Sequence, residues 1–392
     1  MGRKPKSGDA ADYRKTLIEL ASTAVEKRFK KKGGVAIETA SDSLITPSLW
    51  VSTGSLALDR VCRGFNPGGI PVGPKRGRLV HIAGKWSTLK SLILDHLFKS
   101  VQELEGIAVC TESEGSRDPY FPDRIGLDLS EVKIMYPDTI ESAFDAGLSF
   151  ASTIRAVDKE IPIIWGVDSI EAMEAKKTAD SGLSESGSFH YGGGRTQALG
   201  AAFRKVVGET NKHPTTVVLI NQTRTNPMIL FGDKSTTGGG NAPHFYASLE
   251  IFLNPSQKGK VFSPYRGSRL PKELRKKLGL KVTEKGHVAG FWVHARVNKS
   301  KVGGTLGREC DIYLDFQTGI NPVAGLLEVL LEEGVVDFDG KKVVHHLPTA
   351  KKRTFSSQAL WEEWILDNLE VLGPESVRRN GKRTKKKRRK ED

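Results

Sequence analysis

Two patterns of apolar and polar positions alternate along the middle of the chain. Several of the short apolar runs, typical of buried strands, lead into a polar residue at their C-terminal end, and stretches with apolar positions at helical spacing separate several of the runs. The predicted strands cover residues 79–83, 106–110, 132–135, 161–168 and 215–222, and the clearest predicted helices follow the P-loop-like segment near residue 90 and cover 140–157. Strands that are apolar throughout, alternating with helices, predict an α/β fold with a mostly parallel sheet covered on both faces.

The flanks of this region follow other patterns. Three later runs, at residues 249–253, 290–296 and 311–316, have no long helices between them, which predicts antiparallel additions to the sheet. Residues 10–32 place apolar side chains along one helical face opposite a basic one, and a short extended run follows at 35–37. A lone helix and strand bury little surface, so we expect them to dock on another part of the chain or on another subunit.

Composition narrows the class of protein. The 392 residues suffice for one large core with small appendages. No apolar run approaches the roughly 18 residues of a transmembrane span, and the N-terminal residues lack the apolar segment of a signal peptide. The three cysteines, Cys62, Cys110 and Cys310, are far apart in the sequence, which favours a reducing compartment over a disulfide framework or a zinc site. We therefore expect a cytoplasmic protein without a membrane partner.

The formal charge of +14 is concentrated at the two ends of the chain. Residues 1–33 hold ten Lys or Arg against four acidic residues, and residues 378–392 hold ten against two, so the body between them is neutral. Basic ends of this kind usually meet a polyanion such as a nucleic acid. A solubilising or targeting tail is the alternative.

A candidate phosphate-binding loop lies between the first predicted strand of the sheet and the helix after it. The segment reads Gly84-Lys85-Trp86-Ser87-Thr88-Leu89-Lys90-Ser91. In a P-loop, backbone amides and the helix N-terminus face the phosphates, a lysine reaches the outer phosphates and a hydroxyl holds Mg²⁺. The motif requires glycine where this chain has Leu89. Taken alone, the segment is therefore also compatible with an ordinary strand-to-helix turn.

Acidic and amide side chains follow neighbouring strands of the predicted sheet. Asp168 ends an apolar strand, as the Walker-B acid that orders Mg²⁺ does, and Glu114 follows an adjacent strand. Gln222 ends the predicted strand at 215–222, which follows the Asp168 strand along the chain. Ligands bind at the carboxyl ends of parallel strands, so these side chains favour a real nucleotide site.

The chain resembles the RecA family of recombinases, and within it most closely the phage branch typified by UvsX. The similarity covers roughly residues 13–335. The residues that carry it are Val51–Asp59 ahead of the P-loop, Asn221–Arg224, Phe231-Gly232, Thr236–Ala242 and Phe245–Ser248 around a second DNA-binding loop, and Val297–Lys301.

The resemblance implies a role for each matching residue in binding and hydrolysing ATP with Mg²⁺. Lys90 and the rest of the Gly84–Ser91 segment would hold the phosphates, Ser91 and Asp168 would hold the metal ion, and Glu114 would activate water. The resemblance also implies that Asp118, Tyr120 and Phe121 contact adenine and that Gln222 senses the γ-phosphate. Lys299 and Lys301 would complete the site of a neighbouring subunit.

Two glycine-rich segments, at about residues 175–195 and 223–243, are predicted to be loops at the nucleotide side of the sheet. Long loops inside a compact domain are usually functional or disordered, and basic residues with free amides grip a phosphate backbone without reading sequence. The candidate DNA-binding residues are Lys176, Lys177, Arg195, Arg224, Phe231, Gly232, Lys234, Thr236, Thr237, Gly238, Gly239, Gly240 and Asn241. Mobile surface loops without a ligand are the alternative.

The expected organisation follows from these segments. It comprises an N-terminal docking segment at 1–48, a RecA-like ATPase core at 49–320, a small C-terminal region at 321–373 and a disordered basic tail at 374–392. The resemblance implies a DNA-dependent ATPase that forms a filament on single-stranded DNA and exchanges strands with duplex DNA. Single-strand-binding and mediator proteins are further expected partners, in the bacterial host cytoplasm if a phage encodes the chain.

Several features depart from the family pattern and keep two alternatives open. Leu89 replaces a glycine, Trp86 is bulky, and the C-terminal tail is basic where the family's tail is typically acidic. The alternatives are a DNA-binding filament protein with impaired hydrolysis and a helicase-type motor of the same fold, such as the DnaB type. The segment from Thr236 to Ser248 argues against the helicase.

Overall fold

The computed structural model describes residues 9–29, 49–63, 69–73, 76–115, 117, 119–179, 193–225, 235–263, 273, 287–304, 306–347 and 351–372. The chain divides into two compact units, Met1–Thr46 and Pro47–Asp392.

The described part of the first unit is the helix α1 (Asp9–Phe29), which confirms the helix predicted from the apolar spacing. Several of its apolar side chains are largely exposed, among them Leu17 at 48%, Ile18 at 65% and Leu20 at 63%. Helices in proteins gain most of their stability from a packed face, so exposed apolar side chains of this kind suit docking on another surface. The docking role of this segment stays a prediction. The strand predicted at 35–37 lies outside the described residues.

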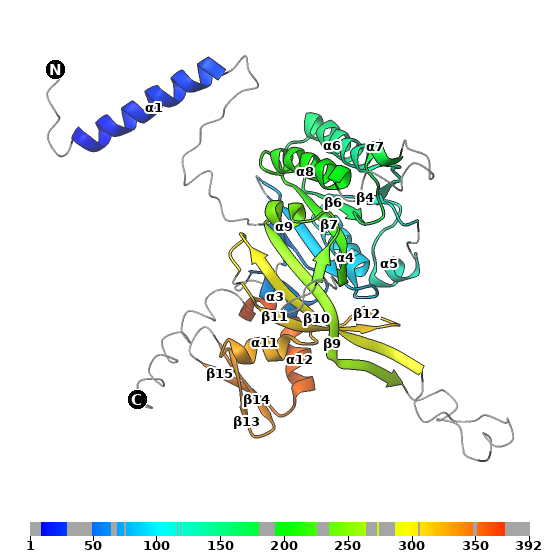
Figure 1. The fold of residues 1–392 in the computed structure, drawn as a ribbon. Coiled ribbons are helices and arrows are strands. Elements are labelled where there is room, and N and C mark those ends of the chain that lie inside the picture. The colour runs from blue at the N-terminus through cyan, green and yellow to red at the C-terminus, as the bar shows by residue number, and fades with distance from the viewer. Residues whose placement is uncertain are drawn as a thin grey trace. The chain divides into compact units, whose positions relative to one another are not determined.

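A large mixed sheet organises the second unit (Figure 1). Its strands are β3 (Leu79–Gly84), β4 (Ile107–Glu112), β5 (Lys133–Met135), β6 (Ile163–Asp168), β7 (Thr215–Thr225), β8 (Ser235–Thr237), β9 (Leu249–Ser263), β10 (His287–Ser300), β11 (Glu309–Asp315) and β12 (Gly319–Ile320). Their order is β12-β11-β10-β9-β3-β7-β6-β4-β5, and β8 pairs with the end of β7. The pairs from β3 to β5 are parallel, which confirms the α/β prediction.

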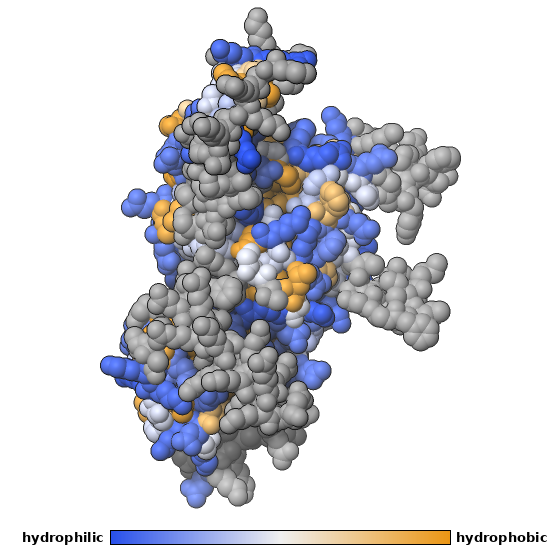
Figure 2. All heavy atoms as spheres, turned by 90° about the vertical axis from the view of Figure 1, so that its left-hand side faces the viewer, coloured by the Kyte–Doolittle hydropathy of each residue, from blue (hydrophilic) through white to orange (hydrophobic). Residues whose placement is uncertain are grey.

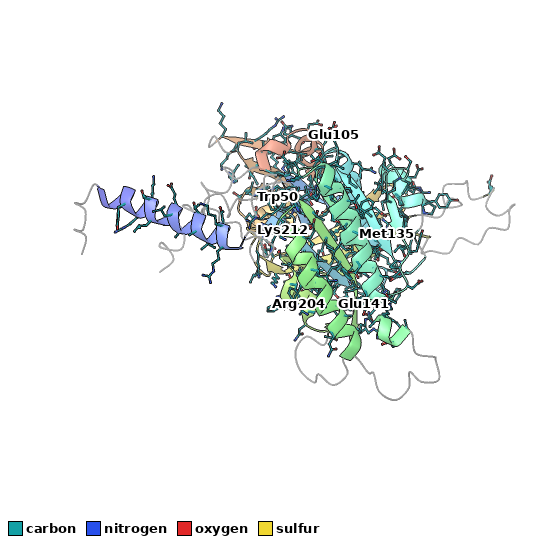
Figure 3. The ribbon with its side chains drawn as sticks, turned by 90° about the horizontal axis from the view of Figure 1, so that it is seen from above. Trp50, Glu105, Met135, Glu141, Arg204 and Lys212 are labelled. Carbon is teal, nitrogen blue, oxygen red and sulfur yellow. The ribbon has the colours of Figure 1, made fainter. Side chains whose placement is uncertain are left out.

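Helices cover both faces of this sheet. They are α3 (Leu56–Arg63), α4 (Lys90–Gln102), α5 (Tyr120–Ile125), α6 (Ile140–Val157), α7 (Lys176–Ala179), α8 (Gly193–Thr210) and α9 (Ala242–Tyr246). Side chains alternate between the faces of a strand, so Val218 and Ile220 of β7 join one hydrophobic cluster with α3 and α4. Val217 and Leu219 join a second cluster with α6 and α8. These two helices lie side by side, marked by Glu141 on α6 and Arg204 on α8 in Figure 3.

The direction of β9 corrects the prediction for residues 249–253. This strand runs parallel to β3, with Ile82 opposite Ile251, whereas β10 and β11 are antiparallel as predicted. After β7 the chain returns past β3, with α9 contacting β3, before β9 begins. The path of that connection therefore decides the direction of β9, which its own composition does not encode. Figure 1 shows β9 and β10 continuing as a long ribbon beyond the rest of the sheet.

The two predicted glycine-rich loops are shorter in the structure than the sequence suggested. The first predicted loop includes α7 and the first turn of α8, and the second includes the end of β7, all of β8 and the start of α9. Hydrogen bonds within and between these short elements override the loop-forming tendency of glycine. Residues 180–192 and 226–234 lie outside the described part of the chain.

The C-terminal region packs on the same hydrophobic cluster as α3 and α4. It contains α11 (Leu326–Glu332), the antiparallel strands β13 (Val336–Asp339), β14 (Lys342–His346) and β15 (Lys352–Phe355), then α12 (Gln358–Asp367) and the 3₁₀ helix η3 (Leu369–Leu372). Trp361 of α12 is fully buried in this cluster. The buried Arg60 of α3 donates from Nε and Nη2 to Glu333 Oε2, at 2.9 and 2.7 Å, which satisfies a charge that burial would otherwise penalise.

Two smaller features complete the described fold. The strands β1 (Leu49–Val51) and β2 (Ile70–Gly73) form a separate two-stranded antiparallel sheet. Among the helices that the structure describes, none has the length and hydrophobicity of a membrane span. Where the face drawn in Figure 2 is coloured, it is mostly hydrophilic, with hydrophobic side chains in separate small patches. The basic tail predicted at 374–392 lies outside the described residues.

Candidate functional site

The loop between β3 and α4 folds over its own first carbonyl. Thr88 Oγ1 and Lys90 Nζ each donate a hydrogen bond to the carbonyl oxygen of Lys85, both at 2.7 Å. The ammonium of Lys90, which is 8% exposed, therefore lies against the loop rather than in bulk solvent. Burial lowers the pKa of Lys90, and the nearby charges of Asp168 and Glu114 partly oppose this.

Leu89 takes the backbone conformation that glycine would supply. Its φ is +67°, in the left-handed region, and it precedes the first residue of α4. A Cβ makes this conformation costly, by roughly 1–2 kcal/mol. The leucine side chain is 8% exposed and belongs to the hydrophobic cluster with α3 and α4. The core contact that leucine adds thus opposes the strain that its Cβ introduces.

Two oxygen-bearing side chains that suit Mg²⁺ come together here: a carboxylate at the carboxyl end of β6 and a hydroxyl from the first turn of α4. Asp168 ends β6 and is 6% exposed, and Ser91 in the first turn of α4 donates a hydrogen bond to it. Burial raises the pKa of Asp168, while that hydrogen bond and the charge of Arg117 oppose the shift. A carboxylate and a hydroxyl oxygen side by side are ligands that Mg²⁺ prefers. These two residues therefore fit the metal ion predicted for them.

Glu114 connects the ends of three adjacent strands. Its Oε1 accepts hydrogen bonds from Ser169 Oγ at 2.6 Å and from Gln222 Nε2 at 3.2 Å. The carboxylate of Glu112 accepts from the backbone amides of Glu114 and Gly115, at 3.0 and 2.9 Å. Burial and the nearby Asp168 raise the pKa of Glu112. This arrangement fixes the turn that carries Glu114.

Ser169 and Glu112 were not among the functional residues predicted from the sequence. Glu112 was visible as part of an acidic cluster at a strand end, but its hydrogen bonds to backbone amides required the folded turn. Ser169 directly follows the strand-ending Asp168, and that adjacency was the available signal. Both residues contact Glu114: Ser169 donates to its carboxylate, and Glu112 accepts from its backbone amide.

A cavity of about 290 Å³ joins these groups. Its lining consists of Trp86, Ser87, Thr88, Leu89, Lys90, Ser91, Leu92, Glu114, Asp168, Ile220 and Gln222. The structure thus brings together the residues predicted for phosphate, metal and water, whereas Gly84 and Lys85 are not part of the lining.

The predicted adenine contacts are not part of this cavity. Tyr120 is 72% exposed, and Phe121 is half-buried against the core with the Arg124 guanidinium 5.9 Å from its ring centroid. Asp118 lies outside the described residues. Neither Tyr120 nor Phe121 lines the cavity, so their contact with a base stays a prediction.

Lys299 and Lys301 lie at the end of β10 and do not line the cavity of their own chain. Lys299 Nζ donates to the backbone carbonyls of His244 and of Phe245, the latter at 3.0 Å, at the C-terminal end of α9. Burial and the charge of Lys301 lower the pKa of Lys299. Lys301 is exposed. Their action on a neighbouring subunit's nucleotide stays a prediction.

A polar chain that the sequence did not reveal, buried except at His244, links β3 to α9. Glu250 of β9 pairs with His81 Nδ1 at 2.9 Å and with His244 Nδ1 at 2.8 Å, and Asn221 Nδ2 lies 3.2 Å from His81 Nε2. Burial alone would raise the pKa of Glu250, but the hydrogen bonds from the two histidines hold it below its ordinary value. Asn221 also donates to the carbonyl of Gly238 at 2.9 Å. The chain fixes the root of the second predicted loop next to Gln222.

The structure brings only part of the predicted DNA-binding set together. Arg195 of α8 and Arg224 of β7 both pair with Glu171, a residue the sequence analysis did not select. Lys176 is exposed at the start of α7, which also contains Lys177. The remaining described members, in β8 and the turn after it, are Thr236, Thr237, Gly238, Gly239, Gly240 and Asn241. Phe231, Gly232 and Lys234 lie outside the described residues.

Comparisons with known proteins identify the family of this chain. The family model described as the RecA N-terminal domain matches residues 16–269. Protein RecA of Limosilactobacillus reuteri (strain DSM 20016) is 28% identical over 330 residues, which cover 84% of this chain and 79% of the relative. Protein RecA of Geobacter sulfurreducens is 28% identical over 328 residues, covering 83% of this chain and 84% of the relative. Because the family model matches more than half of the 392 residues, the chain belongs to the RecA family.

Proposed function

We propose that this chain is an ATP-dependent DNA recombinase that assembles as a filament on single-stranded DNA and exchanges its strand with a homologous duplex. The observation that carries the proposal is the continuity of β7. Gln222 lines the cavity with Lys90, Asp168 and Glu114, and two residues later the same strand presents Arg224 beside the second predicted DNA-binding loop. A shift of Gln222 at the cavity can therefore move Arg224, a predicted DNA-binding residue, through the backbone of β7.

The charged and metal-binding residues of the cavity have definite tasks in ATP hydrolysis under this proposal. Lys90 donates to the outer phosphates instead of to the Lys85 carbonyl. Ser91 and Asp168 would hold Mg²⁺, which supplies neutralisation of phosphate charge. Phosphoryl transfer is catalysed mostly by positioning and electrostatic stabilisation, so these contacts matter more than any covalent step. Leu89 does not block the loop, because its side chain points into the core.

Glu114 is the residue we assign to the attacking water. It accepts hydrogen bonds from Ser169 and Gln222, and these hold the carboxylate at the mouth of the cavity. An exposed carboxylate at this position can accept a hydrogen bond from water and orient it. Gln222 reports the occupancy of the γ-phosphate position because its amide already contacts Glu114.

The second subunit would complete the site. Lys299 and Lys301 lie away from the cavity of their own chain, and two lysines at one strand end suit the stabilisation of phosphate charge across an interface. We further propose the phage-type branch of the family, the four-part domain organisation given above, and action in the bacterial cytoplasm. Single-strand-binding and mediator proteins are the proposed accessory partners.

The test combines ATP turnover, with and without single-stranded DNA, and strand exchange, with and without ATP. Lys90→Ala should lower DNA-stimulated turnover roughly 100-fold or more, because it removes a charge that contacts the transferred phosphate. Lys99→Ala is the matched control, since Lys99 is on the same helix but forms a surface pair with Glu103. A parent protein that hydrolyses ATP without exchanging strands would support the helicase-type motor. A parent that binds DNA without turnover would support the hydrolysis-impaired filament protein.

A further inference from the structure

Glu171 lies where the two predicted DNA-binding loops meet the core. It follows Asp168 by three residues, in the turn after β6, and its side chain is only 9% exposed. One carboxylate oxygen, Oε2, accepts from Arg195 Nη2 at 3.2 Å, and the other, Oε1, pairs closely with Arg224 Nη2. A single, mostly buried carboxylate therefore holds two arginines, one from α8 and one from β7, that belong to different predicted DNA-binding segments.

Contacts with neighbouring residues hold the Glu171 side chain in place. Arg195 Nη2 also donates to the carbonyl of Ile170 at 2.6 Å, so its guanidinium is anchored at two points. Gly238, just after β8, packs against the carboxylate so closely that a Cβ at this position would collide with Glu171 Oε2. The carboxylate thus touches the end of the first loop and both ends of the second.

The two arginines differ in how easily each can separate from Glu171. The Arg224 side chain is 72% exposed and that of Arg195 is 28% exposed. A nucleic-acid phosphate presents the same acceptor geometry to a guanidinium as a carboxylate does, so it competes for the same nitrogen atoms. Arg224 is the arginine that can exchange its partner without uncovering the core.

The pairing is coupled by backbone to the nucleotide cavity. Glu171 lies two residues after Ser169, whose hydroxyl donates to Glu114, and Arg224 lies two residues after Gln222, which donates to the same oxygen. Residues two apart on a strand share a face, so Gln222 and Arg224 move together if β7 shifts. The Ile170 amide also donates to the Ile220 carbonyl at 3.1 Å, which holds the two segments side by side.

We propose that Glu171 is a built-in competitor for nucleic acid, a positioning residue that occupies Arg224 until nucleotide binding and DNA phosphate together displace it. The inference rests on the proposed function and deepens it, because it names a regulator of the same site. Without nucleotide, single-stranded DNA must break the pair with Glu171 to reach Arg224. With nucleotide, the contacts of Glu114 and Gln222 change, and the segments that carry Glu171 and Arg224 shift relative to one another. Nucleotide-dependent DNA affinity follows.

The experiment measures binding of a fluorescent oligothymidylate to the full chain by anisotropy, without nucleotide and with a non-hydrolysable ATP analogue and Mg²⁺. Glu171→Gln should raise the nucleotide-free affinity about five-fold, the scale of one broken ion pair, and leave the analogue-bound affinity within about two-fold of the parent. The enhancement by nucleotide shrinks accordingly. Asp145→Asn is the matched control, since it removes the same charge from a surface pair with Lys205 of α8.

Arg224→Ala provides a second, independent readout. In that background, Glu171→Gln should change the nucleotide-free affinity by less than about two-fold, because the competed side chain is absent. A Glu171→Gln variant that loses affinity in both nucleotide states, or that behaves as Asp145→Asn does, overturns the inference while leaving the proposed function intact. A parent that binds the oligonucleotide in neither state overturns both.

Discussion

Leu89 gives a quantitative test of how this P-loop tolerates a side chain. Its φ of +67° favours glycine, and its side chain is 8% exposed in the core. Replacing Leu89 with alanine removes most of that burial but keeps the Cβ and hence the strain. Replacing it with glycine removes both. The difference between the two variants therefore isolates the backbone term.

The magnitudes predict the sign of that difference. Loss of a buried leucine side chain typically costs about 2–5 kcal/mol of unfolding free energy, and both variants incur most of it. Glycine recovers the left-handed penalty of about 1–2 kcal/mol. It loses about 0.4–1 kcal/mol through the greater entropy of its unfolded chain. We expect Leu89→Gly to be more stable than Leu89→Ala by about 0.5–1 kcal/mol, although both are less stable than the parent.

Urea unfolding of the full chain, followed by circular dichroism, measures the comparison. Leu97 is the control position, because it lies in the middle of α4 and is fully buried. There alanine should exceed glycine by about 1 kcal/mol, the usual helix preference. ATP turnover of Leu89→Gly should persist, since Lys90 and the loop carbonyl it contacts are retained. Finding alanine the more stable residue at position 89 would refute the reasoning about strain.

Two further predictions concern the subunit interface and the C-terminal region. Changing both Lys299 and Lys301 to alanine should spare nucleotide binding but lower DNA-dependent ATP turnover, and mixing this variant with Glu114→Gln should restore part of it. No rescue at any mixing ratio, with co-assembly verified, would argue against a shared site. His345 accepts from Trp361 Nε1 at 3.2 Å, and burial, with His346 and Arg60 nearby, lowers its pKa from 6.5 to about 4. Between pH 6.5 and 4 only the unfolded chain binds this proton, so roughly 3 kcal/mol of stability is lost as the pH falls. His345→Gln should flatten the unfolding profile over that range, and an unchanged slope would contradict the assignment.

Local patterns determined the parts of the fold that depend on neighbours in sequence. The run from Leu79 to Ala83 is apolar except for His81 because β3 is buried on both faces, and the helical spacing over 140–157 matches α6 to the residue. Asp168 and Gln222 stood out because polar residues at the ends of apolar strands occupy the one edge of a parallel sheet where ligands bind. The sequence therefore sufficed to predict the α/β core and to nominate the main lining of the cavity.

Only the tertiary structure decided the features that depend on distant segments. The direction of β9 follows from a crossover past β3, and nothing within residues 249–253 encodes it. The position of Tyr120 outside the cavity follows from the packing of α5. Glu171 looked like one more polar residue in a turn until the folded chain brought Arg195 and Arg224 to it. The spacing of apolar and polar residues indicates which face of a helix or strand is buried. Which charged side chains meet across the sheet depends on the strand order, and only the folded chain determines that order.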